Sequence, residues 1–512
     1  MAIVCLACAL LCGCEPSEPA PPTVEGRETS RAALAGPRLT LLVVDDASLA
    51  AAAGRLRGEW HSSTGAEFNV VEMTEVDLLA CTQIECDALI FPAHDLGELA
   101  ERGWLSPLPT DAIDDRDFGL DWPDIFETNR AAESVWGAQV VAVPFGSPVF
   151  VCAYRADWFE RFGREPPRNW AEYQALAEFF SNHEGARGAI EPWGPGWAGL
   201  TLLARSATYA KHRDFYSPLF DMETMAPLVA GPPFVRALNE MAAVSRMAPV
   251  EFRAGGLADV REALSQGRSA MALVWLAPPA SATVAEFARI PAGDAVAEFA
   301  RIQAGDTVAE FARIPAGNDA AAGAAKPPAL GFVELPGGAE MYNPSLGSWE
   351  RRRDDDTGRV TFLPAAGRLG AVAEPTAHGD AAARLLAWLS GPEWSEQVAA
   401  ASAATTLFRK SHLDSPQHWV GPQFGAGAAG PYAETVAKAL DGHAFFAAPR
   451  ISGRARYLQA LDRAVRRVLS DEAKSQEALD TVADEWRTIT DELGVDQQRS
   501  AYRRSLGLSN DQ

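Results

Sequence analysis

Basic residues are scarce in this chain of 512 residues. It holds 45 Lys and Arg against 68 Asp and Glu, which gives a formal net charge of −23 at pH 7. Binding to nucleic-acid phosphates requires concentrated Lys and Arg, so we do not expect a nucleic-acid partner. A strongly acidic surface keeps a protein in solution but does not identify its ligand.

The sequence also lacks the short motifs of common enzymes. It contains no G-x-x-x-x-G-K-[ST] phosphate loop, no G-x-S-x-G turn and no H-E-x-x-H zinc motif. Its eight His are scattered, and His412 and His418 have no third ligand at metal spacing. Residues 425–430 match G-x-G-x-x-G, but no predicted strand precedes them, which favours a flexible loop. We therefore predict no catalytic residue, no metal, no cofactor and no enzymatic activity.

The N-terminal apolar segment, residues 1–11, is too short for a membrane-spanning helix. It leads into LCGC at residues 11–14, which resembles the lipobox of bacterial lipoproteins, with Cys14 as the residue to be acylated. A Pro-rich tether follows, with no prospect of a core. No Lys or Arg precedes the apolar segment, so either translation begins further upstream or the amine of Met1 supplies the charge. The alternative is an apolar N-terminus without this role.

Short apolar strands alternate with helical segments after the tether. Residues 39–44, 68–71 and 88–91 have the pattern of strands, and a segment with helical spacing follows the first of them. This alternation predicts a mostly parallel sheet in an α/β lobe. Ligands of such sheets lie beyond the carboxyl ends of the strands, where Asp46 and Asp95 are placed here.

The stretch from Trp136 to Phe180 organises the rest of the chain. Two apolar runs are broken by Gly146, and Asn169 is positioned to cap a helix, with Glu172 three residues later. The order VAVPFG, YRADWFERFG and PPRNWAEYQALA resembles the first crossing between the lobes of family 1 extracellular solute-binding proteins. ALIFPAHDLGELAERGWLSPL and ADVREALSQGRSAMALVW extend the resemblance, which covers residues 39–508 apart from one insertion. These proteins deliver sugars and related solutes to ABC importers.

The resemblance implies an α/β, two-lobed periplasmic-binding-protein-like fold with a multi-strand hinge and a ligand cleft between the lobes. The expected parts are a lipoprotein signal peptide (1–14), a tether (15–38), a first lobe (39–146 and 330–400) and a second lobe (147–329 and 401–508). The insertion, at 283–318, is a tandem repeat of about 12 residues, TVAEFARIPAGD and two variants. We interpret it as an expanded surface loop, with a partner-docking arm as the alternative.

Aromatic and acidic residues near strand ends and Gly-rich turns are the candidates for a ligand site. Sugars have hydroxyl rims and apolar faces, so their sites combine carboxylates and amides with flat aromatic rings. The resemblance implies that these places face the cleft. The candidate ligand-binding residues are Asp46, Asp95, Trp193, Trp197, Trp275, Trp349 and Arg409. Each has a structural alternative: the Trp residues pack in the core, Asp95 caps the following helix, and Arg409 braces the lobes.

Three Cys remain after residue 14. Export to an oxidising compartment would allow Cys81 and Cys86 to form a disulfide that closes a small loop. A metal site is disfavoured as the alternative, because it would need more ligands nearby. Cys152 falls within an apolar strand, which indicates an inert core thiol.

We therefore predict a monomeric, membrane-anchored lipoprotein outside the cytoplasm. It would bind one carbohydrate or related polyol by hinge closure and present it to an ABC permease. Asp95 would accept hydrogen bonds from hydroxyls, while Trp197 and Trp275 would stack on sugar faces. Two alternatives stay open: a non-transport binding or scaffolding protein on the same fold, and an exported carbohydrate-active enzyme with a pair of catalytic carboxylates.

Overall fold

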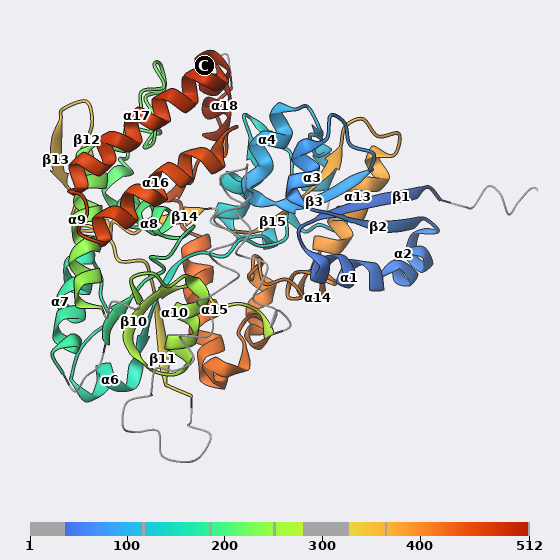
Figure 1. The fold of residues 1–512 in the computed structure, drawn as a ribbon. Helices are drawn as coiled ribbons and strands as arrows, with labels where there is room; N and C mark the ends of the chain where they lie inside the picture. The colour runs from blue at the N-terminus through green and yellow to red at the C-terminus, as the bar shows by residue number, and fades with distance from the viewer. Residues whose placement is uncertain are drawn as a thin grey trace, which may run out of the picture.

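Two β-sheets organise the part of the chain that the computed structural model describes (Figure 1). That part comprises residues 36–114, 118–183, 187–248, 252–279, 327–363 and 366–509. The predicted signal peptide with Cys14, most of the predicted tether and the tandem repeat at 283–318 lie outside these residues.

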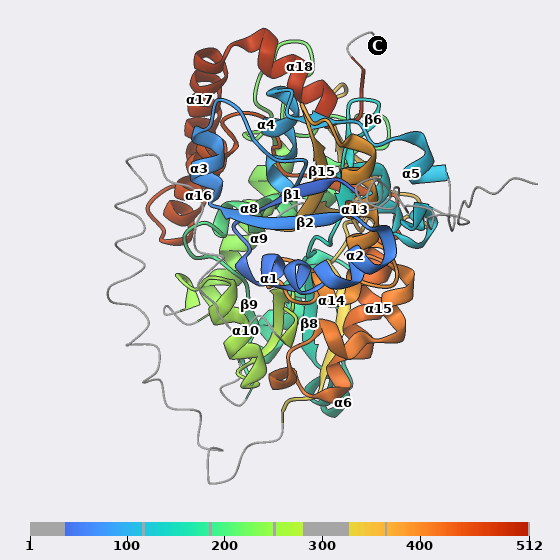
Figure 2. The same cartoon turned by 90° about the vertical axis from the view of Figure 1, so that its right-hand side faces the viewer.

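The first sheet has the strand order β2-β1-β3-β15-β4, and β7 also pairs with β15. Its strands are β1 (Arg38–Val44), β2 (Glu67–Met73), β3 (Ala88–Pro92), β4 (Leu105–Ser106), β7 (Val143–Pro144) and β15 (Arg368–Ala373). β1 runs parallel to both β2 and β3, which confirms the parallel arrangement predicted for residues 39–91. Helix α1 (Ala47–Arg55) lies on one side of β1 and β2, and α4 (Leu96–Glu101) on the other (Figure 2). Helix α13 (Gly379–Ser390) packs against β15.

The second sheet has the order β11-β8-β10-β9. Its strands are β8 (Val151–Arg155), β9 (Arg187–Ile190), β10 (Ser269–Val274) and β11 (Leu330–Glu334). Every residue of β10 is buried. The predicted cap is confirmed, because Asn169 accepts a hydrogen bond from the backbone of Glu172 at the start of α7 (Trp170–Ser181). Two further helices, α10 (Leu257–Ser265) and α15 (Ala429–Leu440), pack against β10 and β11 respectively.

One predicted lobe boundary is wrong. We expected residues 330–400 to form the second part of the first lobe, but β11 pairs antiparallel with β8 along its whole length. Leu330–Glu334 is therefore an edge strand of the second sheet. The chain returns to the first sheet only at β15, because strand pairing and not sequence order decides which lobe a strand joins.

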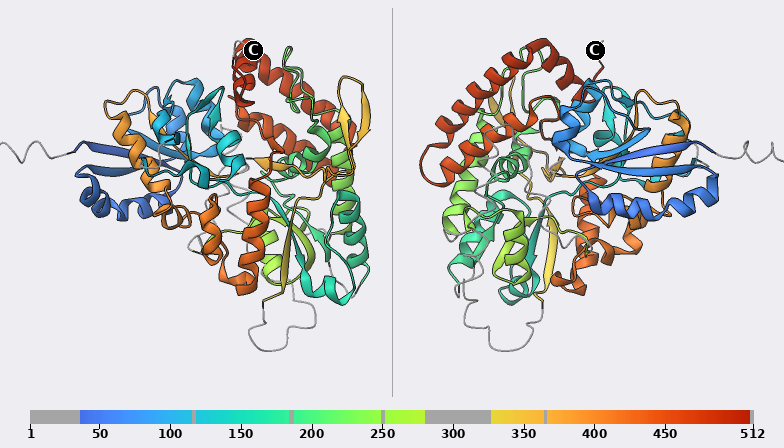
Figure 3. Two further views of the ribbon diagram at one scale, coloured as in Figure 1. Left: turned by 180° about the vertical axis from the view of Figure 1, so that it is seen from behind. Right: turned by 45° about the vertical axis from the view of Figure 1, so that its right-hand side comes forward.

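Five helices form a layer over the second lobe. They are α8 (Ala198–Ala210), α9 (Pro232–Met247), α16 (Arg454–Leu469), α17 (Ser475–Leu493) and α18 (Val495–Ser505). The apolar faces of α16 and α17 are buried, and Trp486 packs on Tyr457 and Phe220 at ring-centroid distances of 5.3 and 5.1 Å. Figure 3 shows α16–α18 extending from the second lobe to the first, where α18 contacts α4. Among the described helices, none combines the length and apolarity that crossing a membrane requires.

Two glycines hold the connecting segments between the lobes close together. The amide of Phe145 donates to the carbonyl of Arg368 at 2.9 Å, and the amide of Arg368 donates to the carbonyl of Gly146 at 3.1 Å. Gly146 has φ +99°, and a Cβ there would lie 2.2 Å from the carbonyl oxygen of Thr406. Gly367 has φ +136°, and a Cβ there would lie 1.8 Å from Oγ of Ser147. Only residues without a side chain permit this approach.

We predict that Gly146→Ala lowers the free energy of unfolding by at least roughly 1–3 kcal/mol, because the new methyl group meets a backbone carbonyl and φ stays strained. Thermal and urea unfolding of the purified protein measure the effect. Gly427→Ala is the matched control, since φ there is not positive and nothing in the described structure lies within 4 Å of its would-be Cβ. Equal free energies of unfolding for the two variants would contradict the close approach of Gly146 to the carbonyl of Thr406.

Candidate functional site

The carboxyl ends of the parallel strands bring acidic side chains to one edge of the first sheet. β1, β2 and β3 end at Val44, Met73 and Pro92, and Pro92 lies opposite Arg368, the first residue of β15. The side chains that follow these ends are Asp45, Asp46, Glu75, His94 and Asp95, and Arg368 lies beside them. This set, hereafter the acidic edge, occupies the position at which α/β sheets bind ligands.

Aromatic residues occupy the corresponding edge of the second sheet. Its strand registers align Val151 with Val274 and with Glu334, so Phe150 and Trp275 lie at the same edge. β9 runs parallel to β10 and ends at Ile190, which adds Glu191 to this edge. The chain leaves the first sheet at β7, opposite Leu369, and reaches Phe150 six residues after Pro144. The two edges therefore lie at the two ends of the segment that joins the lobes.

Asp46 has a structural role within the acidic edge. Its carboxylate accepts a hydrogen bond of 3.0 Å from the backbone of Leu49 and so caps α1. It also accepts from the hydroxyl of Ser402 and lies 3.0 Å from Nε of Arg368. These three contacts occupy the carboxylate, which ties α1, β15 and the segment after α14 (Ser395–Ala399) together.

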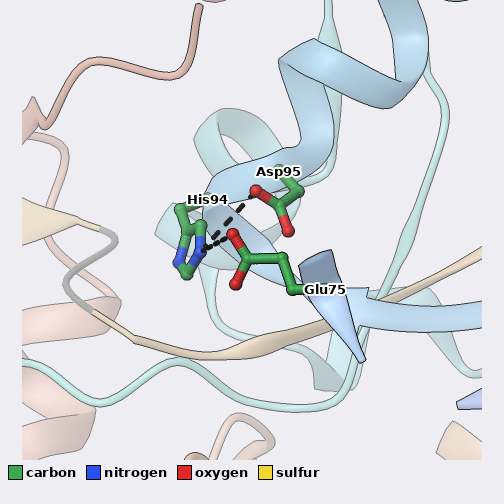
Figure 4. A group of neighbouring side chains, drawn as sticks. All are labelled: Glu75, His94 and Asp95. Atoms are coloured by element: carbon green, nitrogen blue, oxygen red, sulfur yellow. Dashed lines mark ion pairs between the residues drawn. The ribbon is translucent and has the colours of Figure 1, made fainter. Parts of the chain in front are cut away.

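Glu75, His94 and Asp95 form a compact group at the acidic edge (Figure 4). Nε2 of His94 lies 3.5 Å from Oε1 of Glu75 and 3.6 Å from Oδ1 of Asp95. The Glu75 and Asp95 side chains are each 7% exposed, and that of His94 is 17% exposed. Among the described residues, Oδ2 of Asp95 has no hydrogen-bond partner, and the Asp95 side chain does not cap α4. The expected alternative role of Asp95 as a helix cap is therefore wrong.

Burial and neighbouring charges set the ionisation of this group. Burial, together with the charge of Arg454, lowers the pKa of His94 to about 4, so its imidazole is neutral at pH 7. Burial and the adjacent Glu75 raise the pKa of Asp95 well above its ordinary value. Burial opposes the ionisation of Glu75. The interactions with His94, Arg454 and Arg368 outweigh that effect and lower the pKa of Glu75. The group therefore holds one ionised carboxylate, that of Glu75, and burial disfavours a second negative charge on Asp95.

Arg454 reaches the acidic edge from the other lobe. It is the first residue of α16, and its charge acts on Glu75, His94 and Asp95. Nearby, Oγ of Ser452 donates to Glu98 at 2.6 Å, and Arg504 forms an ion pair with Glu101 of α4. Sequence analysis identified neither Glu75 nor Arg454, because neither belongs to a local motif and their meeting depends on how α16 packs.

Trp275, Trp197 and Phe150 form an aromatic cluster at the edge of the second sheet. The ring of Trp275 lies 4.8 Å from that of Phe150 and 5.3 Å from that of Trp197. Trp275 is fully buried and Trp197 is half-buried. Nε of Arg261 donates to the carbonyl of Trp275 at 2.7 Å. In the described chain, Nε1 of Trp275 and Nη2 of Arg261 have no hydrogen-bond partner, which leaves two buried donors at this edge.

Trp193 belongs to a buried polar group in the core of the second lobe. Its Nε1 donates to Glu191 at 3.2 Å, and Glu191 forms a fully buried ion pair with Arg205. The guanidinium of Arg205 lies 4.0 Å from the centroid of the Trp170 ring. Removal of one member of such a pair would leave an uncompensated buried charge, so Trp193 belongs to a structural group in the core of the lobe.

Two candidate residues lie away from both edges. Trp349 is on β13 (Ser348–Arg351), which pairs with β12 (Glu340–Asn343), and its ring packs against Tyr209 and Tyr342. Arg409 is fully buried and donates to the carbonyls of Ser390 and Leu120, both at 2.7 Å. Arg409 thus joins its own segment to two segments of the first lobe, and both Trp349 and Arg409 have structural partners that local sequence does not reveal.

The predicted disulfide is wrong, because Cys81 and Cys86, which both lie in the described part of the chain, are free thiols. Sγ of Cys81 donates to the carbonyl of Asp77 at the end of α3 (Glu75–Ala80), whereas Cys86 packs into the core. Burial raises the pKa of Cys86 to about 12 and also that of Cys152 to about 12. Cys152 is fully buried, as predicted for an inert core thiol.

Comparison with known proteins identifies the family. The sequence model of the bacterial extracellular solute-binding protein family matches residues 88–396, more than half of the chain. Among curated protein sequences, none is significantly similar.

Solved structures establish the fold. The sugar-binding protein MalE of Xanthomonas citri is 15% identical over 89% of this chain and 98% of its own, with a TM-score of 0.61. Maltose-bound MalE3 of T. maritima is 16% identical over 89% of this chain and 100% of its own, with a TM-score of 0.56. A ribitol-bound ABC transporter solute-binding protein of Agrobacterium radiobacter K84 is 18% identical over 89% and 99%, with a TM-score of 0.55. The predicted two-lobed periplasmic-binding-protein fold is thus confirmed, and the chain belongs to the bacterial extracellular solute-binding proteins, the non-enzymatic binding components of ABC transporters.

Proposed function

We propose that this protein binds a carbohydrate or related polyol between its lobes and presents it to an ABC permease. The observation that carries the proposal is the pairing of an aromatic edge on one sheet, built from Phe150, Trp197 and Trp275, with the acidic edge on the other. A sugar ring has an apolar face that packs on aromatic rings and hydroxyl groups that hydrogen-bond to carboxylates.

Polar atoms without partners support this assignment. Within the described structure, Nε1 of Trp275, Nη2 of Arg261 and Oδ2 of Asp95 are buried and lack hydrogen-bond partners. Leaving such groups unpaired costs about 1–3 kcal/mol each, and a polyol carries both the donors and the acceptors that would pair them. The solved relatives named above include complexes with maltose and ribitol, and a further one from Agrobacterium vitis S4 holds D-mannitol at 15% identity and a TM-score of 0.54.

Burial at the two edges supports a hinge mechanism. Trp275 exposes 0% of its surface and Asp95 exposes 5%, so a solute can contact them only after a movement that exposes them, and we propose that this movement is separation of the lobes. The first lobe of this proposal comprises residues 39–146 and 366–400, and the second comprises 147–363 and 401–508. Closure would then bury the solute and form the surface that the permease recognises. The receptor would act as a monomer outside the cytoplasm, anchored through a lipid on Cys14.

We predict that Trp197→Ala weakens solute binding at least about tenfold, which corresponds to roughly 1.4 kcal/mol. Trp197 is the half-buried member of the aromatic cluster, whereas removal of the fully buried Trp275 would also leave a cavity in the core. Isothermal titration of the full chain with maltose, maltotetraose, ribitol and mannitol first identifies the solute and then measures the loss.

Trp349→Ala is the matched control for that experiment. Trp349 is also half-buried and ringed by aromatic residues, but it lies on the β12–β13 hairpin. We expect its affinity for the solute to equal that of the native chain. A loss in Trp349→Ala with none in Trp197→Ala would refute the proposed site, and no binding by the folded native chain would refute the solute class.

We predict that the solute makes the protein more compact. Small-angle scattering should show a smaller radius of gyration at a saturating concentration, because the solute bridges the lobes and shifts the population toward the closed state. Trp197→Ala at the same solute concentration should show a smaller change. An unchanged radius under conditions where calorimetry records full binding would argue against hinge closure.

Lipid anchoring yields a separate prediction. Cys14→Ser should move the protein from the detergent phase to the aqueous phase after phase separation with a non-ionic detergent, since the acylated thiol is removed. Cys12→Ser keeps the second Cys of the motif and should stay in the detergent phase. If both variants partition alike, the predicted acylation of Cys14 is incorrect.

A further inference from the structure

The group of Glu75, His94 and Asp95 has a property that sugar binding does not require. We propose that these three side chains bind one divalent transition-metal ion with the ligand preferences of Zn²⁺. One ligand atom from each of them lies within 4.8 Å of the others, and Figure 4 shows the two carboxylates turned toward the imidazole. Imidazole nitrogen and carboxylate oxygen are ordinary ligands of such an ion.

The spacing within the group fits a shared ion better than direct hydrogen bonds. Nε2 of His94 lies 3.5 Å from Glu75 and 3.6 Å from Asp95, at or beyond the limit of a hydrogen bond. Two ligand atoms about 2.0–2.2 Å from a tetrahedral Zn²⁺ are separated by roughly 3.3–3.5 Å. A small inward movement of both carboxylates would therefore complete three metal–ligand bonds.

His94, which is partly buried, differs from the two buried His of the described chain, His212 and His412, in having both ring nitrogens without a hydrogen-bond partner. Nδ1 of His212 accepts from the backbone of Asp214, and its Nε2 lies 3.3 Å from Glu350. His412 contacts Oγ of Ser395 at 2.9 Å and the amide of Phe408 at 3.4 Å. A ring nitrogen that is already paired is not free to bind a metal, so of these three His in the described chain only His94 combines an available lone pair with two carboxylates.

Asp95 gives an independent reason to place a ligand here. It is buried, and its Oδ2 has no hydrogen-bond partner in the described structure, while its Oδ1 faces His94 (Figure 4). An unpaired buried carboxylate oxygen is costly, and a cation between the two carboxylates removes that cost.

The surrounding charges are compatible with an ion. Arg368 is already engaged, because it pairs with Asp46 and its Nη2 donates to the carbonyl of Asp45 at 2.7 Å. Arg454 is the cation that opposes the ion, although it lies beyond ion-pair distance of the group. Three protein ligands leave the fourth position of a tetrahedral ion for water or, if the proposed function holds, for an oxygen of the solute.

Metal analysis of the full-length protein tests this proposal. The protein is purified without a metal-affinity tag, treated with a chelator, incubated with Zn²⁺ or Co²⁺ and dialysed. Elemental analysis then counts the bound ions, and the visible absorption of Co²⁺ reports tetrahedral coordination. We expect one ion per chain and its loss in His94→Gln and in the isosteric Asp95→Asn, with thermal unfolding used to check that each variant is folded.

His212→Gln is the matched control, since it removes a buried His that also neighbours two carboxylates but whose ring nitrogens are occupied. It should retain the ion. The proposal is overturned if the native chain binds no ion, or if His94→Gln and His212→Gln retain it equally. Solute binding is measured separately, in the absence of metal, and its result does not depend on whether the protein binds an ion. A failure of the metal site is therefore distinguishable from a failure of the proposed function.

Discussion

The close contact between residues 145–147 and 366–368 is the constraint on which the two-lobed arrangement depends. Backbone hydrogen bonds join Phe145 and Gly146 to Arg368, and Gly146 also lies against Thr406. Three segments from distant parts of the sequence therefore pass between the lobes in one place. β7 ends and β15 begins at the edge of the first sheet where β3 has its carboxyl end, so the acidic edge lies next to this contact. Glycine at this point is thus a requirement of the close approach between these segments.

The buried negative charges at the acidic edge are tolerated because each lobe contributes an Arg whose positive charge offsets part of them. Arg368 comes from the same sheet as the carboxylates and is paired with Asp46, whereas Arg454 comes from α16 of the other lobe. Separation of the lobes would remove Arg454 and admit water to Glu75 and Asp95. In the proposed hinge mechanism, opening and closing would therefore change the electrostatic environment of the acidic edge, and a bound solute or ion would take over part of the compensation that water supplies in the open state.

Local sequence patterns were sufficient where the controlling interaction is local. The β1 strand, the Asn169 cap and the buried faces of α16 and α17 follow from alternation, capping and helical spacing within a few residues. Patterns failed where a distant partner decides the outcome. β11 joins the second sheet because β8 is available to pair with it. Arg409 donates to the carbonyl of Leu120, which is 289 positions away in the sequence. Cys86 packs in the hydrophobic core.

The candidate site was predictable only in halves, for the same reason. The aromatic residues and Asp95 each follow a strand, so their positions at sheet edges could be inferred from strand endings. Which of these side chains lie close together depends on the strand registers of the two sheets and on how α16 packs. Neither can be read from residues that are near one another in the sequence. Trp197 and Trp275 meet because β10 ends beside the turn that precedes α8, and Asp95 meets Glu75 because β2 and β3 flank β1. If the proposed site is divided between the two lobes, it is complete only when they close, and its specificity would then depend on lobe packing more than on any one motif.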